Sequence, residues 1–442
     1  MLHNYSVALP PLRIGMLGLG TVGAGTWRVL TRNQRDIVAR SGRPMEIVAV
    51  AVRDLERARR IVGGAVALTT DPFDLVNRAD IDVVVEVMGG TTLARELVLQ
   101  AIANGKHVVT ANKALLAEHG AEIFAAAEAR GVIVAYEAAV AVSIPIIKAL
   151  REGLVANRIA WVAGIVNGTS NFILTEMGSK GIGYANALKD AQDQGFAEAD
   201  PRFDVEGTDA AHKLCLLAAN AFGTQVPFAE VHTEGITELE AVDLACAEAL
   251  GYRIKLLGVA RRHDHSVEVR VHPALLRSDH LLAGVDGSMN AVMVHGDASG
   301  TTLYYGAGAG SEQTASAVIA DLVDVARSAA CDPSERVPHR AFQSHAMADL
   351  PLRPMADTTS AWYLRIICSA TPTAERALLR TLARFGLQAR IYGRYAQPDH
   401  SAHHVVLTQP VAYAALRRAL VSLEQLPAVQ GKVRAVRVET LE

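Results

Sequence analysis

The first 137 residues alternate short apolar runs with longer stretches whose apolar residues recur at helical spacing. The run RIGMLGLG predicts a first strand, and a predicted helix follows from Thr21 to about Val38. Further strands are predicted at 46–52, 81–86, 107–110 and 132–136, and further helices at 93–104 and 113–130. Strands and helices that alternate at this length predict a parallel sheet with helices on both faces.

The regular alternation of strands and helices ends near residue 138. A helix with Pro145 in its first turn is predicted to run from there to about Leu154. The segments that follow contain both helices and strands. Helices are predicted at 169–177, 184–194, 208–222 and 237–250, and strands at 161–167, 253–261, 266–273 and 291–294. They predict an α+β unit inserted after the dinucleotide fold. A glycine-rich loop at 304–316 and a helix at 314–330 follow.

From about residue 359 the predicted order is strand, helix, strand, strand, helix, strand, which is the ferredoxin-like plan of a small domain that can fold alone. This part contains no cluster of catalytic groups, which favours a role in binding or assembly. Three prolines mark residues 336–354 as a linker before it.

The predicted fold class is therefore α/β with three domains. A Rossmann-type dinucleotide-binding domain takes residues 1–137 and 312–335, and an α+β domain takes residues 138–311. A ferredoxin-like domain takes residues 355–442 after the linker.

A length of 442 residues, 50% hydrophobic residues and a formal net charge of −3 indicate a compact globular protein. The balanced charge argues against nucleic acid or an anionic membrane as the main partner. No basic region precedes the apolar residues of the N-terminus, and the most apolar window, 132–147, is too short to span a bilayer, so we expect a cytoplasmic protein.

The cysteines lie far apart, without metal-type or redox-type spacing. We expect all of them to be reduced packing residues: Cys215, Cys246, Cys331 and Cys368.

The glycines Gly18, Gly20 and Gly23 form a G-x-G-x-x-G pattern between the first strand and its helix. They permit a tight turn, close approach of the backbone to a pyrophosphate, and close helix packing, with the phosphates at the helix N-terminus. The stretch that binds the cofactor therefore includes Thr21 and Val22.

The second strand ends in Arg53 and Asp54, where a dinucleotide site reads the adenosine ribose. An acidic residue there favours NAD, whereas an arginine pairs with the additional phosphate of NADP. Both are present. Arg53, with further arginines at 57, 59 and 60, favours NADP, and the alternative is a solvated basic helix face.

Two other segments are candidates for the cofactor site. Thr110 and Lys113 fall at the carboxyl end of a predicted parallel strand, the edge at which such sheets bind ligands. Gly310, in the glycine-rich loop, permits close approach to a cofactor. The alternative for Lys113 is a surface lysine at the start of a helix, and the alternative for Gly310 is a flexible connection.

The segment Gly195 to Lys213 places several carboxylates just before an apolar helix. A helix that begins near Thr208, as a plausible N-cap, puts Asp209 and Lys213 four residues apart on one face. An ordinary helix salt bridge is one interpretation. The apolar surroundings of Lys213 favour a functional one, because a buried ammonium needs a partner or a role.

The motifs GLGTVG, TANKALL, GIVNGTSNFIL, GFAEADPRFDVEGTDAAHK and YYGAGAGSEQTASAV, in this order, resemble those of homoserine dehydrogenase over nearly the whole chain. The C-terminal βαββαβ order resembles the ACT domain of many bacterial members. The resemblance implies reversible reduction of L-aspartate 4-semialdehyde to L-homoserine with NADPH or NADH, a step toward threonine, methionine and isoleucine. It also implies that residues 138–311 form the catalytic and dimerisation domain, and that the protein is a homodimer or homotetramer with L-threonine as a feedback effector.

By resemblance, Lys213 is the proton donor to the aldehyde oxygen, Asp209 orients it, and Lys113 is a second ionic contact or proton-transfer group between cofactor and substrate. Glu198, Asp204 and the Gly195 backbone hold the amino-acid part of the substrate. The resemblance also implies a monovalent cation, usually sodium, held by backbone carbonyls of Glu137, Val140, Val142 and Ile144.

Two departures from the family pattern stand out. The run of residues 139–143 before Ile144 and Pro145 differs from the usual small-residue run, so the loop near the cation and cofactor differs in detail. The Asp-x-Pro-Gly turn after the first strand of the ACT domain is replaced by residues 370–373, which lack its acid and its glycine. The loss of both residues argues against effector binding by this domain.

Two rival functions remain. Aspartate-semialdehyde dehydrogenase shares the substrate and cofactor but forms a thioester on a cysteine, and no cysteine here lies at a strand end or beside a basic group in a loop. A non-catalytic protein that senses NADP and amino acids is the other. The acidic segment with Lys213 argues against it, because a sensor needs no buried lysine at the cofactor face.

Overall fold

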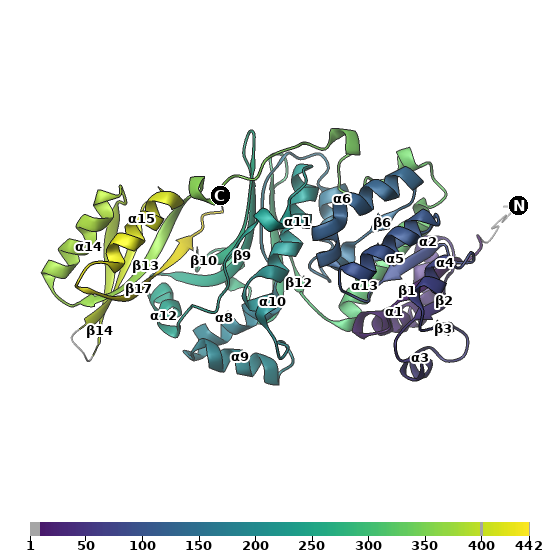
Figure 1. Ribbon diagram of the computed structural model, residues 1–442, viewed down its shortest axis with the longest axis horizontal. Coiled ribbons are helices and arrows are strands. Elements are labelled where there is room, and N and C mark those ends of the chain that lie inside the picture. Colours follow the sequence, from purple (N-terminus) through teal and green to yellow (C-terminus); the bar gives the residue numbers. More distant parts are fainter. Residues whose placement is uncertain (1–8, 398–400, 442) are drawn as a thin grey trace, which may run out of the picture. The chain divides into compact units, whose positions relative to one another are not determined.

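The computed structural model describes residues 9–397 and 401–441 (Figure 1). The chain divides into two compact units, of which the first comprises Met1–Ile159, Cys215–Ala229 and His295–Asp349. The second comprises Ala160–Leu214, Glu230–Val294 and Leu350–Glu442. The three predicted domains and their boundaries stay a prediction, since these units are defined by compactness and not by function.

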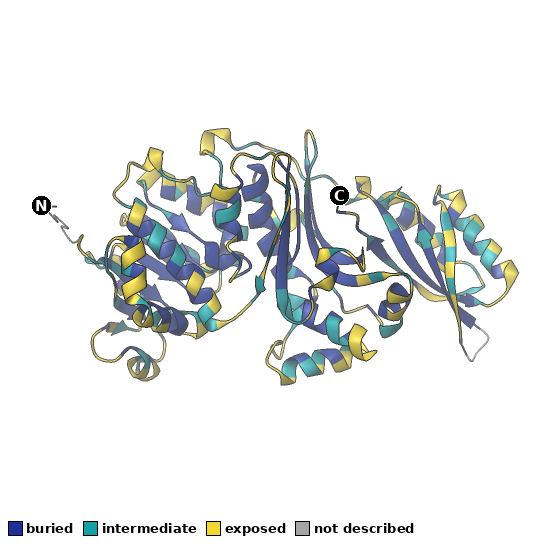
Figure 2. Cartoon of the chain, turned by 180° about the vertical axis from the view of Figure 1, so that it is seen from behind, coloured by how far each residue is buried: buried dark blue, intermediate teal, exposed yellow. Residues whose placement is uncertain are grey.

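The first unit is built on a parallel sheet whose strand order is β3-β2-β1-β4-β5-β6. This is the order of the doubly wound dinucleotide-binding fold, as predicted. Its strands are β1 (Leu12–Leu17), β2 (Met45–Ala51), β3 (Ala67–Thr69), β4 (Val83–Glu86), β5 (His107–Thr110) and β6 (Val134–Ala135). Apart from the edge strand β3, which has no buried residue, these strands are mostly buried (Figure 2), so the centre of the sheet is covered on both faces.

Helices of the first unit connect and cover these strands. They are α1 (Thr21–Arg32), α2 (Gln34–Ser41), α3 (Leu55–Val62), α4 (Pro72–Asn77), α5 (Thr92–Ala103), α6 (Lys113–Arg130), α7 (Ile146–Lys148) and α13 (Ser311–Ser328). The buried faces of α1 and α13 share one apolar core with β1, β2 and β4. Helix α13 therefore belongs with the dinucleotide fold despite its distance in sequence.

Two predictions in this unit were wrong in detail. The helix expected from Thr21 to Val38 breaks at Asn33, whose φ of −105° and ψ of 16° are not helical. Asparagine favours such breaks because its side chain competes for backbone hydrogen bonds. Part of the expected glycine-rich loop is a strand, β12 (Gly300–Ala307), and only 308–310 separate it from α13.

The second unit holds a sheet whose strand order is β11-β7-β9-β10-β17-β13-β15-β14. Its strands are β7 (Ile159–Ile165), β9 (Tyr252–Arg262), β10 (Val267–Arg277), β11 (Met289–Gly296), β13 (Thr359–Ser369), β14 (Ala389–Ala396), β15 (Ser401–Thr408) and β17 (Val429–Val438). The helices of the inserted α+β part are α8 (Gly168–Lys180), α9 (Tyr184–Asp193), α10 (Arg202–Val205), α11 (Thr208–Phe222) and α12 (Ala241–Ala249). Residues 208–214 of α11 belong to the second unit, and residues 215–222 belong to the first.

The C-terminal segment has the predicted βαββαβ order, with α14 (Pro372–Arg384) and α15 (Tyr413–Glu424) between its strands. Its strands lie in the order β17-β13-β15-β14, which is the ferredoxin-like arrangement. It does not stand apart as expected, because β17 also pairs in parallel with β10 through Arg437 and Val438. Leu441 then packs into the core beside β7, β9 and β10. The sheet is therefore continuous into the inserted α+β part.

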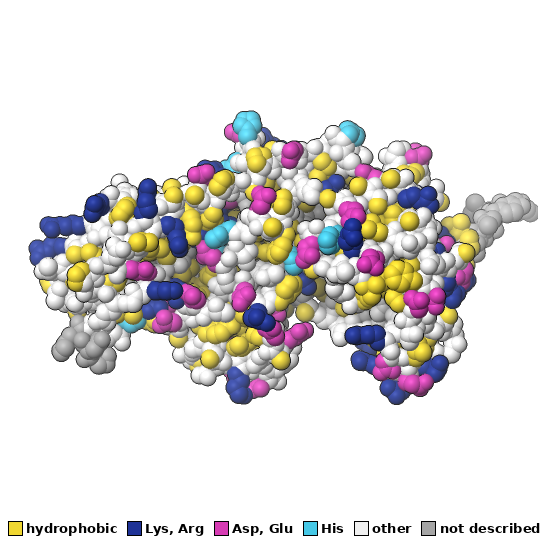
Figure 3. Space-filling model, in the orientation of Figure 1, with side chains coloured by type: hydrophobic (Ala, Val, Ile, Leu, Met, Phe, Trp, Pro, Cys, Tyr) yellow, Lys and Arg dark blue, Asp and Glu magenta, His cyan; other side chains and the backbone are white. Residues whose placement is uncertain are grey.

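The formal net charge of the chain is small, at −3. On the face in Figure 3, acidic and basic side chains are interspersed, consistent with the net charge of −3. Among the described residues, none of the helices combines the length and the apolar character needed to cross a membrane.

Candidate active site

Helix α11 carries the central pair of the predicted site. It begins at Thr208, directly after Gly207, whose φ is +87° and whose added Cβ would lie 2.9 Å from the Thr233 side chain. One turn later, Lys213 Nζ lies 2.7 Å from an Asp209 carboxylate oxygen and 2.6 Å from the Val166 carbonyl oxygen. The side chains of Lys213 and Asp209 are 8% and 5% exposed. The predicted pair is thus present and removed from water.

Asn167 joins this pair to a second carboxylate. Its Nδ2 donates to Asp204 at 2.7 Å and to Asp209 at 2.8 Å. Its Oδ1 accepts from the Ser170 amide at 2.8 Å, which caps α8. Both ends of the buried amide are therefore fixed. The sequence placed Asn167 in a polar turn without a role, although an asparagine at the end of a buried strand and the start of a helix was a usable signal.

Asp204, on the short helix α10, is the second acid of the cluster. Burial raises its pKa, and the nearby charge of Asp209 raises it further, while the hydrogen bond from Asn167 opposes both. The structure therefore brings together Asp204, Asp209, Asn167 and Lys213.

The other acids of the segment lie outside this cluster. Glu198 is exposed, and within the described residues no contact of its carboxylate joins it to Asn167 or Lys213. Gly195 is exposed, with φ of +76° and open space around its Cα. Asp200 pairs with Arg202 at the surface, and Glu206 is exposed, as expected for turn and surface residues.

The three fingerprint glycines each have a different geometric role. Gly18 has φ of +101°, a conformation that favours glycine, and Gly20 has open space where a side chain would project. A Cβ at Gly23 would lie 2.3 Å from the Gly18 carbonyl oxygen. The turn before α1 thus needs glycine at two positions and leaves room for a phosphate at the third.

Gly310 lies beside this fingerprint, as predicted for a cofactor residue. It precedes α13 with φ of +135°. The next residue, Ser311, donates from its hydroxyl to the Thr21 carbonyl at 2.6 Å. A side chain at Gly25 would lie 2.5 Å from the Ser311 carbonyl oxygen, so α1 and α13 meet backbone to backbone.

Thr110 and Lys113 lie at the carboxyl edge of the sheet, where a buried acid organises the backbone. Glu86, at the end of β4, accepts from the Thr110 hydroxyl at 2.7 Å and from the amides of Met88 and Gly89 at 3.0 and 3.1 Å. Burial raises the pKa of Glu86, although these hydrogen bonds oppose the shift. The half-buried Lys113 is the first residue of α6. The sequence interpretation missed Glu86, because it continued an apolar strand.

At the tip of β2, Asp54 accepts a hydrogen bond from the Arg57 amide at 2.9 Å and so caps α3. Arg53 is exposed beside it. One carboxylate oxygen of Asp54 is therefore engaged by the helix, while the guanidinium of Arg53 faces solvent.

The predicted cation loop has an unusual backbone. Ala141 and Val142 both have left-handed φ values, 52° and 49°, which cost about 1–3 kcal/mol each and cluster at functional sites. The carbonyl of Glu137 accepts from Val140 and that of Ile144 accepts from Ile146. Within the described residues, the carbonyl oxygens of Val140 and Val142 accept no hydrogen bond, so two of the four proposed ligands are free. Oxygen donors of this kind suit a hard monovalent cation.

Metal ligation by side chains finds no support. In the part of the chain that the structure describes, no group of three or more His, Cys, Asp or Glu side chains is placed to hold a metal ion.

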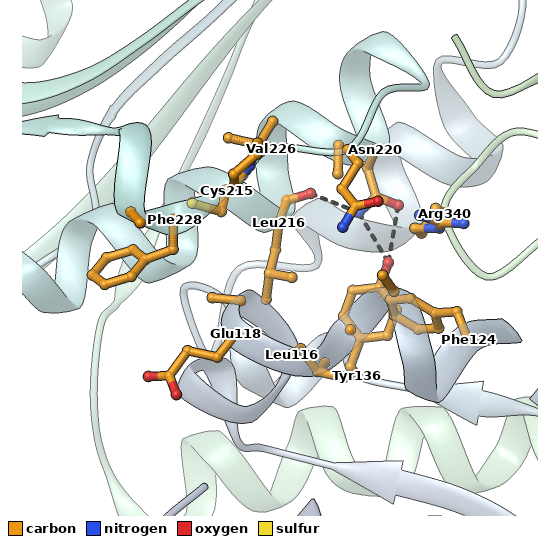
Figure 4. Close-up of a pocket in the computed structure, with 17 residues that line it drawn as sticks. Leu116, Glu118, Phe124, Tyr136, Cys215, Leu216, Asn220, Val226, Phe228 and Arg340 are labelled. Carbon is orange, nitrogen blue, oxygen red and sulfur yellow. Dashed lines mark hydrogen bonds between the residues drawn. The ribbon is translucent and has the colours of Figure 1, made fainter. Parts of the chain in front are cut away.

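A cavity of about 330 Å³ in the first unit lies against α6 and the C-terminal half of α11 (Figure 4). Leu116, Phe124 and Leu216 contribute to its apolar wall. At one end, Asn220 donates to the Tyr136 hydroxyl at 3.0 Å. None of the predicted site residues lines it, so this cavity is not the predicted substrate site.

Comparisons with known proteins decide the family. Residues 18–137 match the family profile "Homoserine dehydrogenase, NAD binding domain", and residues 145–323 match "Homoserine dehydrogenase". The homoserine dehydrogenase of Pseudomonas aeruginosa is 52% identical over 98% of this chain and 100% of its own. The chain belongs to the homoserine dehydrogenase family.

Solved structures of homoserine dehydrogenases agree. The crystal structure of the Thiobacillus denitrificans enzyme is 54% identical, covers 98% of this chain and 99% of its own, and has a TM-score of 0.93. A hyperthermophilic archaeal homoserine dehydrogenase in complex with NADPH is 25% identical, covers 72% of this chain and 97% of its own, and has a TM-score of 0.62.

The predicted activity is thereby confirmed: the chain is a homoserine dehydrogenase, an oxidoreductase that uses a nicotinamide cofactor to interconvert L-aspartate 4-semialdehyde and L-homoserine. Three of the cysteines, Cys215, Cys246 and Cys368, are buried, as expected for packing residues, whereas the expectation was wrong for Cys331, which is exposed. Burial raises the pKa of Cys215 to about 12, that of Cys368 to about 11, and also that of Cys246, so all three are thiols at neutral pH.

Proposed function

We propose that Lys213 is the general acid that protonates the carbonyl oxygen of L-aspartate 4-semialdehyde. The observation that carries this proposal is a buried ammonium held 2.7 Å from Asp209 and 2.6 Å from the Val166 carbonyl. A bound nicotinamide cofactor supplies the hydride to the aldehyde carbon. The electron pair of the C=O bond then moves to oxygen, which takes a proton from Lys213. In the reverse direction neutral Lys213 accepts that proton.

Asp209 acts on this step through Lys213, since it is the carboxylate partner of the ammonium. Asn167 holds Asp209 and Asp204 in fixed positions. Lys113 supplies a second ionic contact for the substrate or takes part in proton transfer. Glu198, Asp204 and the Gly195 backbone bind the amino-acid part of the substrate, whose ammonium requires a carboxylate.

Replacement Asp204→Asn is expected to raise KM for the semialdehyde more than it lowers kcat, because it removes a charge that binds the substrate in ground and transition states alike. Steady-state kinetics at saturating coenzyme measure this. The exposed Asp200→Asn, whose residue pairs with Arg202 at the surface, is the matched control. A fall in kcat with unchanged KM would place Asp204 in the chemical step instead.

The preferred coenzyme is NADPH. Exposed Arg53 next to a helix-capping Asp54 supports this choice, as does the NADPH named in the archaeal complex. We expect Arg53→Ala to raise KM for NADPH about tenfold, the equivalent of one charge-assisted hydrogen bond, and to change KM for NADH little. Arg35→Ala, at an exposed position of α2, is the control. Equal effects on both coenzymes would remove Arg53 from the phosphate site.

A sodium ion binds the carbonyls of Glu137, Val140, Val142 and Ile144, supported by the left-handed backbone and the free carbonyls of this loop. Exchange of NaCl for choline chloride at equal ionic strength should lower Tm. Sodium at about 100 times its Kd adds about 2.7 kcal/mol to stability. Identical melting curves in the two salts would contradict this site.

The ferredoxin-like domain is an ACT domain that regulates the enzyme through L-threonine. The protein is a cytoplasmic homodimer or homotetramer. It acts in the pathway to threonine, methionine and isoleucine. The strand order of residues 359–438 supports the domain assignment. Calorimetric titration with L-threonine tests the regulatory role, and the absence of any heat of binding would refute it. Light scattering tests the oligomeric state, and a monomeric mass would refute the dimer or tetramer.

A further inference from the structure

The cavity of about 330 Å³ between α6 and the C-terminal half of α11 has an apolar wall and a basic end (Figure 4). The wall includes the buried side chains of Leu116, Leu216 and Val226. Arg340 is the one basic residue among those that line the cavity. A volume of this size lies at the low end of the range for small-molecule sites. The cavity therefore has the size and the chemistry of a site for a small ligand.

The guanidinium of Arg340 has a charge that the protein does not neutralise. It lies over the ring of Phe124, 5.3 Å from the ring centroid. Among the residues that the structure describes, none forms an ion pair or a hydrogen bond with this guanidinium. A guanidinium presents a planar set of N–H donors that fits the two oxygens of a carboxylate. This end of the cavity is therefore suited to a carboxylate.

The one acid among the lining residues, Glu118, does not offset this charge. Figure 4 shows Glu118 at the opposite end of the cavity from Arg340. Its carboxylate lies 3.9 Å from Nε2 of His119, its neighbour on α6. The basic end of the cavity is thus separated from the acid by the apolar wall.

The segment that carries Arg340 is fixed on both sides of this residue. Before it, the carbonyl of His339 accepts a hydrogen bond from the Tyr136 hydroxyl at 2.7 Å. After it, the ring of Phe342 packs against the end of α11, where a Cβ at Gly223 would lie 2.7 Å from the ring. The Phe342 amide also donates to the Arg340 carbonyl at 2.7 Å. The backbone of Arg340 is therefore in place before a ligand arrives, which lowers the entropic cost of binding.

We propose that this cavity binds a small apolar monocarboxylate, with its carboxylate on Arg340 and its apolar body against Leu116, Leu216 and Val226. An amine is disfavoured because it would meet the guanidinium. A polyanion such as a nucleotide is disfavoured because one cation cannot compensate several buried charges. The bound ligand contacts α6, α11 and the segment after α13, which are far apart in the sequence of the first unit. Because it binds only where these segments meet, it also raises Tm.

The test is isothermal titration calorimetry of the full-length protein, saturated with NADPH, with phenylacetate as the probe. Phenylacetamide has the same shape without the charge, and phenethylamine has the opposite charge. We expect binding of phenylacetate only. Arg340→Gln, which keeps most of the length of the side chain, should weaken this binding at least about tenfold, as expected for loss of a charge-assisted hydrogen bond. Arg130→Gln, at an exposed position of α6 outside the cavity, is the control that should leave it unchanged.

A second variant tests the place of binding separately from its charge. Ala121→Trp, at an exposed position of the wall, should abolish binding by filling the cavity, while Ala125→Trp, on α6 but outside the wall, should not. Binding that is unchanged in both Arg340→Gln and Ala121→Trp would place the ligand elsewhere and overturn the proposal. Equal binding of phenylacetate and phenylacetamide, or no binding of phenylacetate to the wild type, would also overturn it.

Discussion

Replacement of Glu439 by alanine is expected to lower the free energy of unfolding by about 3 kcal/mol, because it removes one of the two buried carboxylates, Glu439 and Glu268, that pair with the buried guanidinium of Arg270. One Glu439 oxygen lies 2.6 Å from Arg270, and the other lies 3.0 Å from Arg261. The side chains of Glu439 and Arg270 are each 3% exposed. The backbone of Glu439 also donates to Leu275 at 3.0 Å, which extends the contact between β17 and β10.

Chemical denaturation followed by circular dichroism measures this loss. Asp279→Ala is the matched control, since Asp279 also pairs with an arginine, Arg277, at 2.6 Å, but with both side chains exposed. We expect its effect to stay within about 0.5 kcal/mol. If the two variants lose the same stability, the buried pair does not hold the ferredoxin-like domain to β10.

Replacement of Lys213 by alanine is expected to reduce kcat about 10²- to 10⁴-fold, the usual contribution of a positioned general acid. The replacement leaves unchanged the glycine turn of residues 18–23 and Gly310, which we propose to bind the coenzyme. Binding of NADPH should therefore be retained. Oxidation of NADPH in the presence of aspartate semialdehyde measures turnover, and fluorescence titration measures coenzyme binding.

The chain offers a close control in Lys189→Ala. Lys189 pairs with Asp193 four residues later at 2.6 Å, but the side chains are 72% and 63% exposed. The pair has the sequence spacing of Asp209 and Lys213 without the burial. We expect wild-type kinetics for this variant, and a comparable loss of kcat in both variants would show that the lysine at 213 has no special role.

Much of the fold follows from local pattern. The strand His107–Thr110 and the helices Lys113–Arg130 and Thr208–Phe222 begin and end at the predicted residues, because long periodic runs with clear ends specify their own boundaries. The glycine fingerprint could also be predicted from the sequence, since each glycine meets a local geometric requirement of the turn. The i, i+4 pair of Asp209 and Lys213 required only that α11 begin near Thr208.

Contacts between segments that lie far apart in the chain could not be predicted from the sequence. The position of Asn167 between a strand and a helix marks it as a candidate, but it does not show that its amide bridges Asp204 and Asp209, which come from the later helices α10 and α11. The pairing of β17 with β10 likewise depends on residues far apart in the chain, so the ferredoxin-like plan was predicted while its continuity with the sheet was not. Glu86 was missed because its environment, and not its sequence neighbours, makes it a hydrogen-bonding centre.

The central claim is that reduction of the aldehyde depends on the ammonium of Lys213, held by Asp209 and Val166. Its most direct test is the turnover of Lys213→Ala with and without added small primary amines such as ethylamine. The account predicts a variant that binds NADPH, turns over at least about 10²-fold more slowly than the wild type, and regains rate as the amine concentration rises. A Lys213→Ala enzyme that turns over at the wild-type rate without any amine would contradict it.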